Sequence, residues 1–263
     1  MTSLIASIGR GIIYGLKSTG MGTMLMLHTL YNLRYIWRMR GEVLEQMRVV
    51  AVGSLPLVIV TSVFVGAVTA VQAVYQMQAY VPMKFLGTVI SKSVFIELGP
   101  VLMALVVGSR LCANYAAELG TMKVTEQLDA MNIMAIDPVR YLAMPRFVAA
   151  VLMIPVITIF CDAVAIFGGY VASVVTMDVT SSTFIEGLRM FYKASDLLGG
   201  LAKAFIFGGV IAMSGIFFGF NTEGGAEGVG QSVMKSVVGS CLSILVADYL
   251  LAIILFQIIF RGS

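Results

Sequence analysis

The stretch FVAAVLMIPVITIFCDAVAIFGGYVASVVTM, residues 147–177, decides the fold class of this chain. Asp162 is its single acidic or basic residue. A helix needs about 20 predominantly apolar residues to cross the hydrocarbon of a bilayer. This stretch is therefore long enough to span a membrane and to tilt or extend beyond it. Pro155 is expected to kink the helix, because proline interrupts the hydrogen-bond ladder.

The composition of the whole chain agrees with a membrane protein. Of 263 residues, 59% are hydrophobic and 12% are charged, and the mean hydropathy is +0.96. Soluble domains usually contain about 25% charged residues. Four more apolar stretches predict transmembrane helices, at residues 49–75, 94–117, 201–220 and 237–260. The predicted fold class is an all-α integral membrane protein with about five transmembrane helices.

The N-terminal part of the chain has a different pattern. Leu4, Ile8 and Ile12 recur at i, i+4 and i+8, which is typical of an amphipathic helix lying in the membrane interface. We predict that residues 1–48 form an interfacial and cytoplasmic helical segment. Residues 49–263 are predicted to form the transmembrane domain.

The distribution of Lys and Arg predicts the orientation. If the N-terminus is cytoplasmic, the loops on that side hold ten of the 17 Lys and Arg residues. The opposite loops hold six, with Lys203 counted among them, and Arg110 lies within a span. Cytoplasmic loops carry an excess of Lys and Arg. We therefore expect a cytoplasmic N-terminus and a C-terminus on the opposite, periplasmic side.

Residue sets for catalysis or metal binding are missing from the sequence. It has one histidine, and its three cysteines are too widely spaced for a metal site. The glycine-rich run at residues 224–230 lacks the Lys–Ser/Thr pair of a phosphate-binding loop. The dispersed basic residues argue against nucleic acid. We therefore expect neither catalysis nor a bound cofactor in this chain, and any ATP hydrolysis would occur on a separate subunit.

Several ionisable residues fall within or near the predicted spans. Arg110, Asp162 and Asp248 lie inside them, where charge is costly and usually functional. Glu97 and Glu118 lie near the ends of the second span. Arg110 is expected to have a carboxylate partner, with Asp248 the first candidate and Asp162 the second. A structural ion pair and a proton relay are both open roles.

Small residues recur at every fourth position in two predicted spans. They are Ala104, Gly108, Cys112, Ala116 and Gly120 in the second span, and Ala204, Gly208 and Ala212 in the fourth. Such rows let helix backbones approach closely within a bilayer. They fit either packing within one subunit or a seam that slides during transport.

The polar loop between Glu118 and Arg146 predicts a short amphipathic helix. Val124, Leu128 and Met131 recur at i, i+4 and i+7, and Asp137-Pro138 is expected to end the helix. On the cytoplasmic side this helix could dock into the groove of a partner. It could equally lie flat on the membrane.

Four motifs resemble one known family. They are ELGPVLMALVVGSR (97–110), AAELGTMKVTEQLDAM (116–131), IDPVRYLAMPR (136–146) and GGAEGVGQSV (224–233). In this order they closely resemble the MlaE-type (YrbE) permeases, and the likeness extends from about Pro56 to the C-terminus.

The resemblance implies the permease subunit of an ABC transporter in the bacterial inner membrane. It implies a homodimer whose copies each bind a cytoplasmic ATPase, which holds ATP and Mg²⁺. It also implies a periplasmic MCE-domain protein, often a hexamer, and in some systems a small STAS-domain protein. The implied substrate is phospholipid moved between the inner and outer membranes.

The resemblance also implies roles for individual residues. The implied contacts to the ATPase are Glu118, Lys123, Thr125, Glu126, Gln127, Leu128, Asp129 and Met131. The implied lipid-binding residues are Gln72, Tyr75, Gln76, Met77, Tyr80 and Glu97. The first five of these also fit an ordinary aromatic belt and loop. Some relatives carry an arginine where this chain has Ile96, so Lys84 or Lys92 could contact a phosphate instead.

Two other functions remain open. A proton-driven secondary lipid transporter could use Glu97, Asp162 and Asp248. Inverted repeats would support it, and the sequence has no evident internal repeat. An intramembrane lipid enzyme would need a nucleophile or a metal set, which the sequence does not supply.

Overall fold

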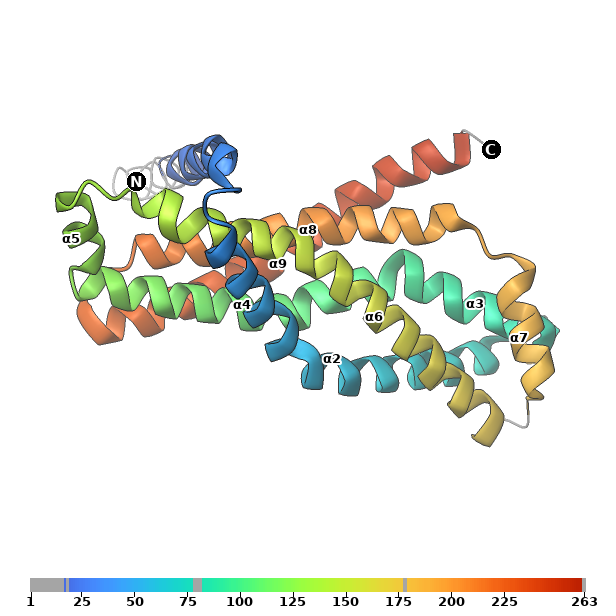
Figure 1. Ribbon diagram of the computed structural model, residues 1–263. Helices are drawn as coiled ribbons and strands as arrows, with labels where there is room; N and C mark the ends of the chain where they lie inside the picture. The colour runs from blue at the N-terminus through green and yellow to red at the C-terminus, as the bar shows by residue number, and fades with distance from the viewer. Residues whose placement is uncertain (1–16, 18, 78–81, 177–178, 262–263) are drawn as a thin grey trace, which may run out of the picture.

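The computed structural model describes residues 17, 19–77, 82–176 and 179–261 (Figure 1). These residues contain helices and connecting turns, and none of them forms a strand. The predicted interfacial residues Leu4, Ile8 and Ile12 lie outside the described residues, as does Tyr80. Residues 19–31 are helical and continue into the 3-10 turn η1 (Asn32–Tyr35).

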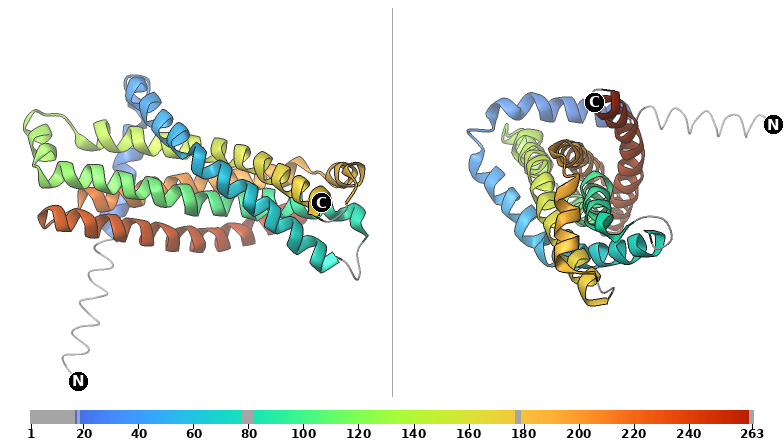
Figure 2. Two further views of the ribbon diagram at one scale, coloured as in Figure 1. Left: turned by 90° about the horizontal axis from the view of Figure 1, so that it is seen from below. Right: turned by 90° about the vertical axis from the view of Figure 1, so that its right-hand side faces the viewer.

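Within the described part of the chain, five helical segments are long and apolar enough to cross a membrane, which confirms the predicted all-α membrane fold. The bounds of their elements are α2 (Arg40–Met77), η2 (Met83–Phe85) with α3 (Leu86–Ser93), η3 (Val94–Leu98) and α4 (Gly99–Val124), then η4 (Val139–Ala143) with α6 (Met144–Thr176), α8 (Ala194–Phe220) and α9 (Gly225–Arg261). Short helices α5 (Gln127–Ile133) and α7 (Ser181–Met190) connect spans at opposite ends (Figures 1 and 2). We call these ends the α5 end and the α7 end.

The second span begins earlier than the predicted residue 94. Its helical segment starts at Met83. The prediction began later because Lys84 and Lys92 lower the apolar content of residues 83–93, which are nevertheless helical. Likewise α2 includes residues 40–48, which the sequence assigned to the N-terminal segment. Pro56 lies inside α2, which bends near its middle (Figure 1).

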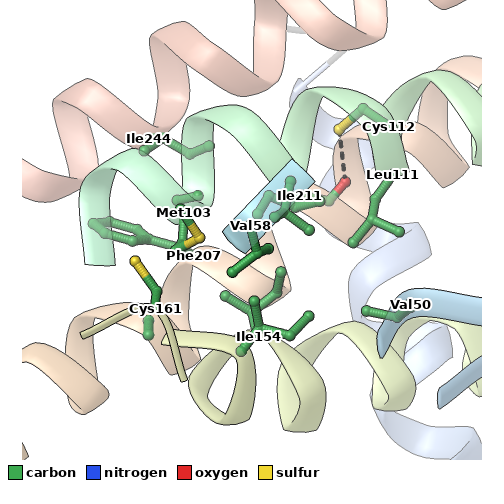
Figure 3. Packing of buried hydrophobic residues seen from close by; sticks show 14 of the residues in the cluster. Val50, Val58, Met103, Leu111, Cys112, Ile154, Cys161, Phe207, Ile211 and Ile244 are labelled. Atoms are coloured by element: carbon green, nitrogen blue, oxygen red, sulfur yellow. Dashed lines mark hydrogen bonds between the residues drawn. The ribbon is translucent and has the colours of Figure 1, made fainter. Parts of the chain in front are cut away.

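Small residues set the closest helix contacts. A Cβ atom on Gly66 of α2 would overlap the carbonyl oxygen of Ala165 on α6. A Cβ on Gly108 of α4 would lie 2.8 Å from the Ile211 side chain of α8. The predicted row from Ala104 to Gly120 is buried against neighbours in the same chain, so this row packs within one subunit. Figure 3 shows this core, where the Cys112 thiol donates to the Ile211 carbonyl at 3.2 Å.

Two wide π turns interrupt the spans, and a proline follows each one. The first, η3, precedes Gly99-Pro100, and the second, η4, precedes Met144-Pro145. A π turn pairs residue i with i+5, and proline has no N–H to donate. In η3 the Phe95 carbonyl therefore lacks its donor, and it lies against Gly200 of α8 instead. The first turn lies toward the α7 end and the second at the α5 end.

Candidate functional site

Lys203 of α8 is the centre of a buried ion cluster. Its ammonium group donates to a carboxylate oxygen of Glu97 at 2.7 Å and to one of Asp248 at 2.8 Å. Lys203 is only 1% exposed, and a buried charge is tolerated when it is paired and hydrogen-bonded. Glu97 belongs to the first π turn and Asp248 to α9, so one lysine joins three spans.

This cluster corrects the predicted partner of Arg110. Asp248 pairs with Lys203, which lies well inside α8 rather than in a loop at its end. Arg110 instead donates to the Ser54 hydroxyl at 2.8 Å, and its guanidinium lies against Gly53 of α2. No carboxylate of the described residues lies within 4.0 Å of Arg110, so a pair with Asp162 is also wrong. A lysine flanked by small apolar residues, as in GGLAKAFIFGG, was the sequence signal for the missed Lys203.

An open groove of about 500 Å³ lies beside the cluster. Its walls come from the α7-end half of α2 and from α3 with the first π turn; the lining residues are Val68, Thr69, Gln72, Ala73, Gln76, Val89, Ser93, Glu97 and Leu98. The Glu97 side chain is 46% exposed, whereas the Lys203 side chain behind it is 2% exposed. The groove therefore presents a carboxylate and two amides on otherwise largely apolar walls.

The structure brings together three of the predicted lipid residues, Gln72, Gln76 and Glu97, in this groove. Tyr75 is 78% exposed on another face of α2, and Met77 is buried in a cluster with α3 and α7 residues. Lys92 pairs with Asp196 of α8 at 3.2 Å. Lys84 lies over the Phe85 ring.

The α5 end has a different arrangement from the predicted one. Val124 is the last residue of α4, and Glu126 adopts a left-handed conformation with φ of 60° before α5 begins. The predicted helix through Val124, Leu128 and Met131 is therefore two helices, because this turn redirects the chain. Leu128 is buried, Met131 packs against the same core, and Lys123 contacts Asp129 at 3.3 Å.

The exposed face around α5 is part polar and part apolar. Thr125, Glu126, Gln127 and Asp129 are exposed. Ile133 and Met134 follow with 86% and 62% exposure, and the sequence reasoning had not selected them. Their signal was the apolar IM pair in an otherwise polar loop.

The second π turn is a junction for the α5 end. Arg146 is buried, donates to Glu118 of α4 at 2.8 Å and also donates to the Leu142 carbonyl. Asp137 accepts from the backbone N–H of Val139 at 3.0 Å and lies 3.2 Å from the ring nitrogen of His28. The N-terminal helix, α4 and α6 are thereby tied together. Among the described residues no group of three or more His, Cys, Asp or Glu could hold a metal.

Comparisons with known proteins agree with this architecture. A family model described as "Permease MlaE" matches residues 43–254. A "Probable ABC transporter permease protein" of Synechocystis sp. is 38% identical over 83% of this chain and 83% of its own length. One with the same description from Rickettsia bellii is 35% identical over 82% of this chain and 83% of its own length. The "Intermembrane phospholipid transport system permease protein MlaE" of Haemophilus influenzae is 30% identical over 97% of this chain and 98% of its own length.

Proposed function

The chain belongs to the MlaE permease family, and from that premise we propose that it is the membrane subunit of an ABC transporter for phospholipid. The relative named for intermembrane phospholipid transport covers nearly the whole chain. The proposed reaction is movement of phospholipid between the inner and outer membranes of a bacterium. The multi-pass chain would lie in the inner membrane with its N-terminus in the cytoplasm.

The observation that carries this proposal is the groove beside the ion cluster. Its apolar walls suit acyl chains, and Gln72, Gln76 and Glu97 offer hydrogen-bonding groups for a headgroup at one edge. Glu97 also touches Lys203, which binds Asp248. A headgroup that displaced Glu97 would therefore change contacts among three spans at once, and this is how an occupied groove could alter the arrangement of the spans.

We propose that the exposed face around α5 binds the ATPase. Thr125, Glu126, Gln127 and Asp129 would provide the polar contacts, and Ile133 and Met134 the apolar ones. Glu118 and Lys123 would act through their ion pairs with Arg146 and Asp129. Leu128 and Met131 would hold α5 on the core rather than touch the partner.

The remaining partners follow from the same proposal. The permease would work as a homodimer, with ATP and Mg²⁺ held on the ATPase and a hexameric MCE-domain protein exchanging lipid with it on the periplasmic side. A STAS-domain protein on the ATPase is a further candidate. Two copies would enclose a cavity to which each contributes its groove.

Affinity purification of the tagged chain in mild detergent tests this proposal. Mass spectrometry should find an ATPase, an MCE-domain protein and phospholipid. The purified complex should then move labelled phospholipid between vesicles only with hydrolysable ATP. A chain that purifies alone and moves lipid with a proton gradient would establish the secondary transporter instead.

Glu126→Lys gives the sharper variant. The exposed side chain can change without disturbing the core, so the variant should fold, lose the ATPase during purification and lose transport. Glu227→Lys is the matched control, since Glu227 is exposed at the start of α9. Leu128→Asp is less informative because Leu128 is buried and the change would also disturb α5. Normal transport by Glu126→Lys would contradict the docking assignment.

A further inference from the structure

Asp162 is a buried acid that the ion cluster does not use. It lies in the middle of α6 and is 2% exposed. Its Oδ1 atom is buried without a hydrogen-bond partner. No Lys, Arg or His nitrogen of the described residues lies within 4.0 Å of its carboxylate. Glu97, Lys203 and Asp248 on the neighbouring elements contact one another instead.

A second buried aspartate among the described residues has a different environment. The Oδ2 atom of Asp196 on α8 is also buried without a hydrogen bond, but the Lys92 ammonium lies 3.2 Å from it and balances its charge. An ionised carboxylate in an apolar interior costs many kcal/mol without such a partner, and the group takes up a proton instead. Within a bilayer the same argument is stronger, because no water can solvate the charge.

The surroundings of the unpartnered oxygen also disfavour a negative charge. Oδ1 lies against the Cα of Gly99, where a Cβ atom would overlap it. The backbone carbonyl oxygen of Val94 lies 3.0 Å from that same Cβ position. A carboxylate would be repelled by this carbonyl dipole, whereas a protonated acid can donate a hydrogen bond toward it.

We propose that Asp162 is a buried proton-binding site and that the neutral acid supports the first π turn from behind. Val94 and Gly99 are the first residue of that turn and the residue after it, and Glu97 lies between them on the groove side. The turn is therefore held between a charged cluster on one side and a neutral acid on the other. Loss of the proton would place a charge against the Val94 carbonyl and push the turn toward the groove. This inference does not depend on the proposed lipid or partners.

Infrared difference spectroscopy of the purified full chain in lipid nanodiscs tests the proposal. Wild type minus Asp162→Asn at neutral pH should contain the carbonyl-stretch band of a protonated carboxylic acid. The band should shift in heavy water and with isotopically labelled aspartate. The matched control is Asp129→Asn, at an exposed aspartate beside Lys123, which should leave the band of the protonated acid unchanged.

A second variant keeps the test decisive if Asp162→Asn does not fold. Gly99→Ala should shift the frequency of the protonated band, because the added methyl group displaces the acid. Gly230→Ala is the matched control and should leave the band unchanged, since nothing lies within 4 Å of its added atom. Absence of the protonated band in labelled wild type at neutral pH would overturn the proposal. Loss of that band on adding sodium chloride would overturn it too, by showing a cation site.

Discussion

The two π turns share a local sequence pattern but differ in what surrounds them. Both VFIELGP (94–100) and VRYLAMP (139–145) begin with Val and reach Pro six residues later. The first turn presents an acid to a groove and to a buried lysine of another span. The second lies beside Arg146, a buried cation whose partner Glu118 is half exposed. The same backbone conformation thus lies beside an open groove at one end and beside an ion pair between α4 and α6 at the other.

The largest expected loss of stability comes from removing Lys203, the cation on α8 that pairs with Glu97 of the first π turn. Lys203→Met leaves the Asp248 carboxylate, which is 15% exposed, without its buried partner, and breaking a buried pair costs about 3–5 kcal/mol of unfolding free energy. Thermal unfolding in detergent measures the loss. Lys92→Met is the matched control and should cost less, since the Lys92 side chain is 38% exposed. Equal stability of the two variants would show that the cluster is not a buried unit.

Removing Arg146, the cation that follows the second π turn, should lower the free energy of unfolding by less. Arg146→Met breaks the bond to Glu118, but the freed carboxylate can be solvated at the α5 end. A hydrogen bond to a charged group contributes about 1.5–3 kcal/mol. Denaturant or thermal unfolding should place this variant between wild type and Lys203→Met. A larger loss than for Lys203→Met would invert the comparison. The exchange of both charges in Glu118→Arg with Arg146→Glu should recover part of the loss.

A glycine in the turn that joins α4 to α5 is expected to give a small gain in stability. Glu126 has φ of 60°, a conformation that costs a non-glycine residue about 1 kcal/mol or more. Glu126→Gly should therefore raise the unfolding free energy by about 1 kcal/mol while weakening ATPase binding. Gln127→Gly is the control, because Gln127 is helical and glycine should destabilise it. A fall in stability for Glu126→Gly would show that its side chain contributes more than the strain costs.

The smallest change in stability is expected for a variant that removes the charge of Glu97 but keeps the shape of its side chain. Glu97→Gln keeps the size of the side chain and leaves Lys203 paired with Asp248. We expect stability within about 1 kcal/mol of wild type, the size of one neutral hydrogen bond, but a changed amount of co-purified phospholipid. Gln231→Glu is a control on α9, away from the groove lining. Unchanged lipid content in Glu97→Gln would remove Glu97 from the proposed binding site.

Much of the fold was predictable because bilayer thickness imposes a length on each apolar stretch. Residues 147–177 required a spanning helix whatever their partners, and the row from Ala104 to Gly120 required a close neighbour. The π turns were not predictable, since prolines at positions 100 and 145 also fit the ordinary first turn of a helix. At the first turn the Phe95 carbonyl oxygen lies against Gly200 of another span, and sequence spacing does not reveal such a contact.

Residue spacing grouped only those groove residues that are close in sequence, whereas Glu97 was assigned to the same site through the family resemblance. Gln72 and Gln76 share one face of α2 because they are four residues apart. The partner of Asp248 could not be found in this way, because Lys203 is 45 residues away and its depth depends on where α8 begins. Which charges pair across spans depends on the tertiary structure. The depth of each side chain in the membrane, estimated from sequence alone, was not accurate enough to identify these pairs.

The ion pair between Arg146 and Glu118 gives α4 the geometry of a lever. Glu118 is held by Arg146 at the α5 end, whereas Glu97 lies 21 residues earlier in the same span, in the first π turn beside the groove. At about 1.5 Å per residue the arm is about 32 Å long. A tilt of about 4° at the fastened end would displace the other end by about 2 Å. A small tilt of the span about the α5 end is therefore enough to change the contacts of Glu97.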